Sequence, residues 1–324
     1  MPSLSGVIEE QISSSLRLDR YVSEYLKILS RSQIKAHNLK AKINGKDAKF
    51  SKLVKQGDNF EFLWDDSLPA DIIPQDIPLE IIYEDENCVV VNKAQGMVVH
   101  PGAGNRQGTL ANALYYRRLK VKNVISSESG VSHVNDTIRE KSNNLRAGIV
   151  HRLDKDTSGI IIAAYNDETH AFLSRQFKER EVRKIYIAVV QGALKEKRGR
   201  INTFISRDFK DRRRFIVSVN GKNAVTFFKV IKVWHNHSLV LLSPRTGRTH
   251  QLRVHMRHIG YPVLGDPVYG NTDSVFPEAS LMLHSKSLAI TLMDETERKV
   301  FSSLTLPDRF SAVMQKLNRM NADG

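Results

Sequence analysis

The chain has 324 residues, of which 49 are Lys or Arg and 35 are Asp or Glu, so its formal net charge is +14. This length suggests two domains, or one large and one small, and a hydrophobic content of 41% is sufficient for a packed core. A positive excess of this size indicates a polyanionic partner, usually nucleic acid. A merely soluble basic protein, or one that favours anionic membrane surfaces, is the alternative.

Three sequence features bear on the cellular compartment. No run of about 20 apolar residues is present, so no membrane span is expected. Residues 1–10 have neither a basic start nor an apolar segment, and they do not resemble a secretory signal. The single cysteine, Cys88, excludes an intramolecular disulfide and lies in an apolar segment where a buried strand thiol is expected. A monomeric cytoplasmic protein is therefore expected.

The first part of the chain has the pattern of a small α/β module over residues 15–66. Residues 1–14 ahead of it are polar and rich in serine, and a flexible tail is expected there. Apolar residues then recur at helical spacing, and Ser30 or Ser32 is a suitable N-cap for a second helix. The pair Asn44-Gly45 predicts the turn of a β-hairpin.

Positive charge is concentrated in this module, with 11 Lys or Arg against 5 Asp or Glu between Arg17 and Trp64. Such a surplus suits phosphate contacts, although a solvated basic face on an unrelated small domain would look the same. The segments Arg17–Asp19, Ser30–Lys35 and Ile43–Lys46 resemble the small RNA-binding module named after ribosomal protein S4. By this resemblance, the implied RNA contacts are Arg31, Lys35, Lys40 and Lys42.

Prolines at positions 69, 74 and 78 indicate a semi-rigid linker over residues 67–78. The second domain is expected over residues 79–316, with a helix at 109–116 and a polar surface insertion at 117–144. Residues 195–214 are a second basic region. Most predicted elements are consecutive strands with few crossover helices. This order favours an α+β fold with a mixed or antiparallel sheet over a doubly wound fold.

A cluster of charged residues precedes a buried strand near the middle of the chain. The run Ile160–Ala164 predicts that strand, and residues 146–159 ahead of it contain His151, Arg152 and Asp154. Charges at the end of a core element are costly unless they are paired. Asp154 is therefore either a structural partner of Arg152 or a carboxylate held for catalysis. An aspartate beside an arginine stays ionised and can act as a nucleophile or a base.

A second concentration of charge covers residues 245–257. A helix is predicted from about Thr249 to Gly260, with His250 and Arg253 on one face and apolar residues on another. A metal site is not expected, because four arginines share the segment and no cysteine or nearby acid completes a ligand set. No Gly-x-Ser-x-Gly or Walker pattern supports serine-nucleophile chemistry or NTP hydrolysis.

Four motifs, in the right order, resemble those of the large Rlu family of RNA pseudouridine synthases. They are His151–Gly159, Arg183–Tyr186, Arg245–Arg257 and Gly265–Gly270. The similarity covers roughly residues 17–305. It implies a reaction without cofactor or metal that breaks the glycosidic bond of a uridine, turns the uracil and rejoins it through carbon 5. Residues 100–105 and 146–149 resemble the subgroup acting on helix 69 of 23S rRNA. The implied partner is therefore 23S rRNA or a precursor of the large ribosomal subunit.

The same resemblance implies individual residue roles. Asp154 is the implied catalytic carboxylate, Tyr186 stacks on the base, and Arg253 pairs with Asp154 and keeps it charged. Arg152 is implied to fill the space that the target base leaves in the RNA. Further candidates for phosphate contact or for support of the site are Lys184, Arg248 and His250.

Two other functions are compatible with parts of the sequence. A non-catalytic RNA-binding factor for ribosome assembly could use the same scaffold, but it has no need for Asp154, Tyr186 and Arg253 together. A DNA-acting or other nucleotide enzyme would require a metal or nucleotide motif that the sequence lacks. The insertion at 117–144 is longer than in the family pattern, which bears on loop contacts and on the identity of the target.

Overall fold

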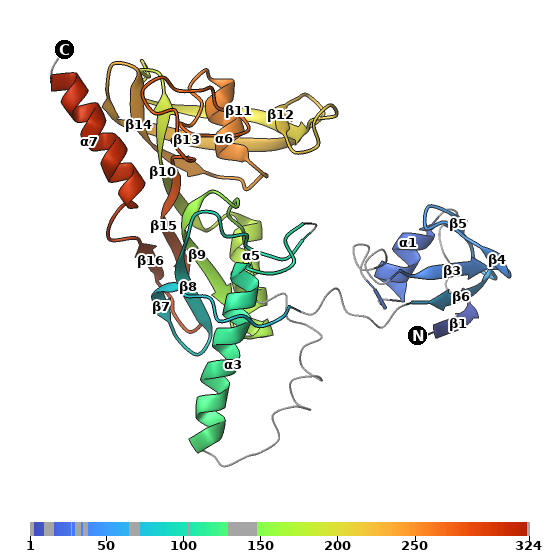
Figure 1. Ribbon diagram of the computed structural model, residues 1–324. Coiled ribbons are helices and arrows are strands. Elements are labelled where there is room, and N and C mark those ends of the chain that lie inside the picture. The colour runs from blue at the N-terminus through green and yellow to red at the C-terminus, as the bar shows by residue number, and fades with distance from the viewer. Residues whose placement is uncertain are drawn as a thin grey trace. The chain divides into compact units, whose positions relative to one another are not determined.

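The computed structural model describes residues 3–9, 16–26, 28–29, 34, 38–64, 72–102, 104–128 and 148–322. The chain forms two compact units, Met1–Asp71 and Ile72–Gly324, and their division lies within the range assigned above to a linker (Figure 1). Within the described ranges, no helix combines the length and the apolar character needed to cross a membrane. Arg31 and Lys35, two of the predicted RNA contacts, lie outside these ranges.

The first unit contains a four-stranded sheet in the order β1-β6-β3-β4 and a two-stranded pair, β2-β5. Its elements are β1 (Ser3–Val7), β2 (Leu16–Arg17), α1 (Leu18–Arg20), η1 (Tyr21–Tyr25), β3 (Lys40–Ile43), β4 (Lys46–Asp47), β5 (Leu53–Val54) and β6 (Asn59–Leu63). Asn44 and Gly45 have φ angles of 54° and 74°, and they form the β3–β4 turn. The hairpin predicted from this Asn-Gly pair is confirmed.

The N-terminal residues form an edge strand. Ser3–Val7 pair antiparallel with Asn59–Leu63, and the Ile8 side chain is completely buried. The prediction of a flexible tail over residues 1–14 is therefore wrong for residues 3–8. The polar residues of this segment suggested a tail, whereas the strand forms through backbone hydrogen bonds to a partner strand far along the chain, which local polarity does not indicate.

The second unit is built on a ten-stranded sheet with the order β12-β11-β13-β14-β10-β15-β9-β8-β7 and with β16 beside β15. In this described sheet, the β15–β9 pairing is parallel and the others are antiparallel. The α+β class predicted from the strand succession is confirmed. The strands are β7 (Glu80–Glu84), β8 (Cys88–Lys93), β9 (Ser158–Ala164), β10 (Arg183–Gln191), β11 (Arg198–Arg207), β12 (Phe215–Val217), β13 (Lys222–Val233), β14 (His237–Pro244), β15 (Leu283–Thr291) and β16 (Arg298–Ser302).

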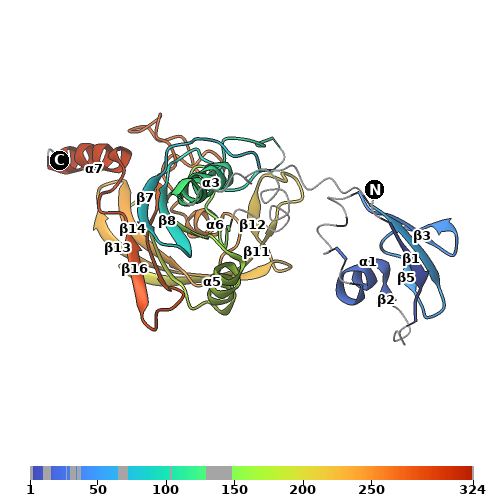
Figure 2. The ribbon, with the colours of Figure 1, turned by 90° about the horizontal axis from the view of Figure 1, so that it is seen from below.

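The helices of the second unit cover both faces of this sheet, with α6 and α7 on opposite sides (Figure 2). They are α3 (Leu110–Glu128), α5 (Asp167–Glu179), α6 (Gln251–His258) and α7 (Asp308–Ala322). Phe310, Val313 and Leu317 of α7 are buried at helical spacing. The ordered part of the domain thus extends past the predicted end at residue 316.

The helix α3 runs well past its predicted end at residue 116, so the first part of the predicted insertion at 117–144 is helical. Arg117 anchors this part of the helix through two hydrogen bonds, of 2.8 and 2.5 Å, to the carboxylate of Glu84. Such a tertiary anchor leaves no trace in local periodicity, which is weak in this helix. The last residues of the insertion lie outside the described ranges.

Candidate active site

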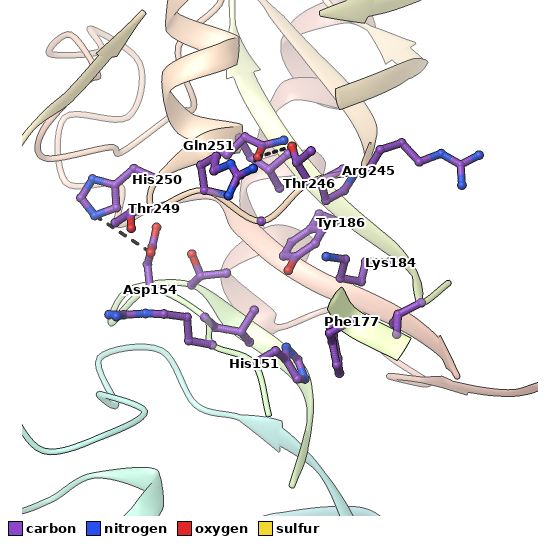
Figure 3. Close-up of a pocket in the computed structure, with 18 of the residues that line it drawn as sticks. His151, Asp154, Phe177, Lys184, Tyr186, Arg245, Thr246, Thr249, His250 and Gln251 are labelled. Atoms are coloured by element: carbon purple, nitrogen blue, oxygen red, sulfur yellow. Dashed lines mark hydrogen bonds and ion pairs between the residues drawn. The ribbon is translucent and has the colours of Figure 1, made fainter. Parts of the chain in front are cut away.

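A cavity of about 490 Å³ lies where the loop ahead of β9, the first half of β10 and the start of α6 meet (Figure 3). It gathers residues that three separate sequence motifs supply. The predicted site residues that line it are Arg152, Asp154, Lys184, Tyr186, Arg248 and His250. Arg253 lies behind this lining and contacts Asp154 from the buried side.

The loop that carries Asp154 is held rigidly. At its end, Gly159 has a φ of +115°, and a Cβ there would lie 2.3 Å from the carbonyl oxygen of Ser285, so no larger residue fits. Lys93, fully buried at the end of β8, donates hydrogen bonds to three carbonyl oxygens, including that of Lys155. Burial lowers the pKa of Lys93 to about 8, although the nearby charges of Asp156 and Asp154 act in the opposite direction. The position of Asp154 is thus set by the scaffold.

Asp154 contacts Arg253, but a second aspartate holds Arg253 more tightly. Nη1 of Arg253 donates to Oδ2 of Asp154 at 3.4 Å, whereas its Nε and Nη2 donate to the two oxygens of Asp266 at 2.7 Å each. The buried Asp266 also accepts the backbone N–H groups of Val268 and Tyr269. Burial opposes charge on Arg253, but the bonds with Asp266 raise its pKa. Asp154 therefore lies beside a fixed cation.

The predicted contact between Arg253 and Asp154 is present, and the alternative that Asp154 is a structural partner of Arg152 is wrong. Arg152 is exposed at the cavity and forms no ion pair with a described residue.

Asp266 was missed in the sequence. A signal existed, because a buried arginine requires a carboxylate partner. The helix pattern concealed it by placing Arg253 on one face with His250, whereas Gln251 to Met256 are all buried in α6.

Tyr186 and Asp154 both project into the cavity (Figure 3). The β10–β15 pairing shifts register between Ile185 and Tyr186, and such bulges re-aim side chains beside active sites. Burial raises the pKa of Tyr186 to about 12, the Asp154 charge adds to this, and a hydrogen bond with Ser285 opposes it. The phenol therefore stays protonated at neutral pH.

Lys184 is a cation at the cavity wall without a carboxylate partner among the described residues. Its Nζ lies 5.9 Å from the ring centre of Phe177, which stacks on His151 with 4.5 Å between ring centres. Burial lowers the pKa of Lys184, and burial together with the Lys184 charge lowers that of His151 to about 3. His151 is therefore neutral, and its Nε2 accepts the backbone N–H of Ile162. A cation in this position suits an anionic ligand.

The helix α6 begins at Gln251, slightly later than predicted, and His250 is its N-cap residue with a left-handed φ of 55°. Nε of Arg248 donates to the carbonyl oxygen of Asn223 at 3.1 Å. Nε2 of His250 lies 4.0 Å from Oδ1 of Asp154. Across the described ranges, no three His, Cys, Asp or Glu side chains gather in a way that could hold a metal ion.

The predicted RNA contacts of the first unit are described in part. Lys40 and Lys42 lie on the exposed face of β3, where polar and buried residues alternate. Neither forms an ion pair with a described residue, so both ammonium groups are available to solvent or to a polyanion.

Comparison with known proteins agrees with this geometry. The family profile described as RNA pseudouridylate synthase matches residues 87–258, which include Asp154, Tyr186 and Arg253. A ribosomal large subunit pseudouridine synthase D from Borreliella burgdorferi is 41% identical over 304 residues, which is 92% of this chain and 88% of the relative. An uncharacterized RNA pseudouridine synthase from Aquifex aeolicus is 40% identical over 86% of this chain and 85% of its own.

A solved structure supports the same assignment. The protein named human RNA pseudouridylate synthase domain containing 1 aligns with a TM-score of 0.54 and 28% identity, over 74% of this chain and 95% of its own. The family profile covers more than half of the 324 residues, and its match spans all three motifs that form the cavity. The chain therefore belongs to the RNA pseudouridylate synthase family.

Proposed function

We propose that this enzyme isomerises specific uridines of large-subunit ribosomal RNA to pseudouridine. The Borreliella burgdorferi relative is named for the ribosomal large subunit. The observation that carries the proposal is an aspartate, Asp154, beside a fixed arginine in a cavity of about 490 Å³ that also contains Tyr186 and Lys184. A cavity of this kind suits a single base taken out of its stack. No observation favours the non-catalytic assembly-factor alternative.

The reaction breaks the N1–C1′ bond of uridine, turns the uracil and forms a C5–C1′ bond, after which C5 loses its proton and N1 gains one. In this proposal Asp154 acts on the reacting nucleotide as nucleophile or base, and Arg253 orients it. Tyr186 stacks on the uracil and donates a hydrogen bond, because a phenol with a pKa of about 12 is protonated at pH 7. Because the phenol keeps its own proton, the Asp154 carboxylate is the proposed acceptor for the C5 proton.

RNA contacts are proposed in both units. Lys184 and Arg248 would contact phosphates at the cavity, and Arg152 would fill the gap left by the target base. Lys40 and Lys42 would act within an S4-like RNA-binding module. The absence of carboxylate partners for these lysines among the described residues supports this role. The proposed target is helix 69 of 23S rRNA, and the proposed state is a cytoplasmic monomer.

The test is the formation of pseudouridine in 23S rRNA by the purified chain, mapped by carbodiimide labelling and reverse transcription. Asp154→Asn should fold normally and lower the rate by about 10³-fold or more, because an amide neither attacks carbon nor accepts a proton. Asp156→Asn is the matched control, since Asp156 lies in the same loop but outside the cavity lining. Unmodified rRNA after incubation with the wild-type chain would overturn the proposed substrate. Full activity of Asp154→Asn would remove Asp154 from the chemistry.

A further inference from the structure

The imidazole ring of His250 is clamped in one orientation. Its backbone has the left-handed conformation, which is uncommon for residues other than glycine. The rings of Phe215 and Tyr269 pack against it edge to face, each with 5.6 Å between ring centres. Nδ1 of His250 lies 2.8 Å from the hydroxyl oxygen of Tyr269. A surface residue whose function is to contact RNA does not need its ring to be fixed by so many contacts.

The hydrogen bonds of Tyr269 decide which nitrogen of His250 carries the proton. The Tyr269 hydroxyl oxygen accepts the backbone N–H of Phe215 at 2.8 Å. Its own proton then has one acceptor among the described residues, Nδ1 of His250. Because Nδ1 is the acceptor, a neutral imidazole carries its hydrogen on Nε2.

Nε2 faces the Asp154 carboxylate, as the dashed line in Figure 3 indicates. It lies 4.0 Å from Oδ1, while Nη1 of Arg253 lies 3.4 Å from Oδ2. Each carboxylate oxygen therefore faces one N–H group: that of the Arg253 cation within hydrogen-bonding distance, and that of the neutral ring at 4.0 Å, too far for a direct hydrogen bond. A dipole and a cation that face opposite oxygens favour one orientation of the carboxylate about its Cβ–Cγ bond.

We infer that His250, with its tautomer set by Tyr269, is a positioning residue for Asp154 and is not an RNA contact. The inference rests on the proposed function, because it assigns His250 to the aspartate that performs the chemistry. The sequence left two roles open for His250, phosphate contact and support of the site, and the inference selects the second and names the residue supported.

The charges around His250 are consistent with a neutral ring. Burial lowers its pKa, and although the nearby Asp154 charge acts against this, the pKa remains below its usual value. The other charged groups that face it are Arg253, Asp266 and Arg152. A neutral N–H group orients the carboxylate without offering it a readily transferred proton.

The first experiment reads the tautomer directly, without any assay of activity. Long-range ¹H–¹⁵N correlation spectra of the full-length chain at pH 7, assigned with His250→Gln, should show the proton of His250 on Nε2. Tyr269→Phe removes the hydroxyl that fixes this tautomer and should give a mixture of the two forms. A wild-type ring with its proton on Nδ1, or a wholly cationic ring, would overturn the inference even if the enzyme is active.

The second experiment separates catalysis from binding. His250→Ala should lower kcat for pseudouridine formation by roughly 10- to 100-fold, the scale on which a misplaced reacting group acts. The Kd for target RNA, measured for Asp154→Asn with and without His250→Ala, should change less than twofold. His250→Gln keeps an N–H donor and should recover part of kcat. His258→Ala, an exposed histidine of the same helix, controls for general effects on α6.

The opposite pattern identifies a phosphate contact. If His250→Ala raises Kd strongly and leaves kcat at saturating RNA unchanged, His250 binds RNA and the inference is wrong. If the wild-type chain forms no pseudouridine at all, the proposed function fails, and the tautomer measurement still decides the arrangement of His250 and Tyr269.

Discussion

Arginine and aspartate form ion pairs in two regions of the second unit, and the two pairs differ in their contact with water. At the floor of the cavity, the side chains of Arg253 and Asp266 are 4% and 0% exposed. In the loop after β11, Arg213 and Asp211 also form two hydrogen bonds, of 3.1 and 3.0 Å, but their exposures are 86% and 32%. Similar bonds thus lie in very different dielectric surroundings.

This difference separates two uses of charge in the same enzyme. A buried charge is costly unless it is paired, so the pair at the cavity floor has a single stable geometry and fixes the cation beside Asp154. An exposed charge is solvated, adds little to stability and stays available to phosphates. Removing buried charges is therefore expected to have larger effects than removing exposed ones.

The largest effect is expected for Asp266→Ala. It leaves the Arg253 guanidinium buried without its main partner and removes the acceptor for two backbone N–H groups. The free energy of unfolding of the second unit should fall by about 3–5 kcal/mol, as measured by urea denaturation. Pseudouridine formation should fall as well, because Arg253 is then free to move away from Asp154 or to pair with it more closely and displace it.

The exposed pair supplies the control for this prediction. Asp211→Ala breaks bonds of the same type between the same two residue types, but it leaves Arg213 in water. Its denaturation curve should overlay that of the wild-type chain. If the two alanine variants unfold at the same urea concentration, burial is not what distinguishes the two regions.

The next effect is a loss of stability in mild acid, caused by histidines that the fold keeps neutral. Burial lowers the pKa of His151 to about 3, and that of His255 and His284 to about 4. In the unfolded chain these histidines have a pKa of about 6.5, so between pH 6.5 and 4 the unfolded chain binds protons that the folded chain does not. Stability must therefore fall as pH falls through this window, by up to roughly 1.4 kcal/mol per pH unit for each histidine.

The first unit offers the internal comparison for this pH dependence. It contains one histidine, His37, and among its described residues the buried carboxylate is that of Asp58. Burial tends to raise the pKa of Asp58, but hydrogen bonds from Lys55 and Asn44 lower it overall, so its contribution is lost only below about pH 4. Calorimetry between pH 6.5 and 4.5 should show the transition of the second unit moving to lower temperature while that of the first moves little. Equal shifts of both transitions would contradict this account.

Lys184→Met is expected to have two smaller effects of opposite sign, a gain in stability and a loss of affinity for RNA. Burial lowers the pKa of Lys184 in the folded protein. The Lys184 charge therefore reduces the free energy of unfolding at pH values below this lowered pKa, and the reduction disappears as the pH rises through it. Methionine removes this cost and should raise stability by roughly 0.5–2 kcal/mol at pH 7. The same change should weaken RNA binding and reduce the slope of log Kd against log salt by about 0.7–0.9. Lys195→Met, at an exposed position outside the cavity, should show neither effect.

The sequence reveals most of the sheet because the buried strands carry continuous or alternating apolar residues. β9 is buried at every position and its Ile/Ala run is unmistakable. β11 was missed, because Arg198 and Arg200 occupy its exposed face and mask the buried Ile201 and Ile205. The register of the parallel pairing between β15 and β9 has no local signal at all.

The site was predictable where a sequence motif carries the residue: Asp154 stood out among the charges ahead of a buried strand, and the resemblance to the family supplied the roles of Asp154 and Tyr186. It was not predictable where the function of one side chain depends on another that is close only in space. Asp266 and Tyr269 look like ordinary turn residues in the chain, yet one fixes Arg253 and the other fixes His250. Such pairings follow from how the loop after α6 packs under the cavity, which requires the tertiary structure.

The smallest effect per residue is expected on the exposed face of the first unit. Lys40→Gln and Lys42→Gln each remove one solvated charge from β3 and leave its buried residues untouched. Together they should reduce the salt slope of RNA binding by about 1.4–1.8, with no change in the free energy of unfolding beyond about 0.5 kcal/mol. The loss of affinity should be recovered at low salt, which distinguishes it from the Asp266→Ala defect, since lowering the salt does not replace a missing buried partner. If the double variant binds RNA with an unchanged salt slope, these lysines are ordinary solvated charges and the first unit contacts RNA elsewhere or not at all.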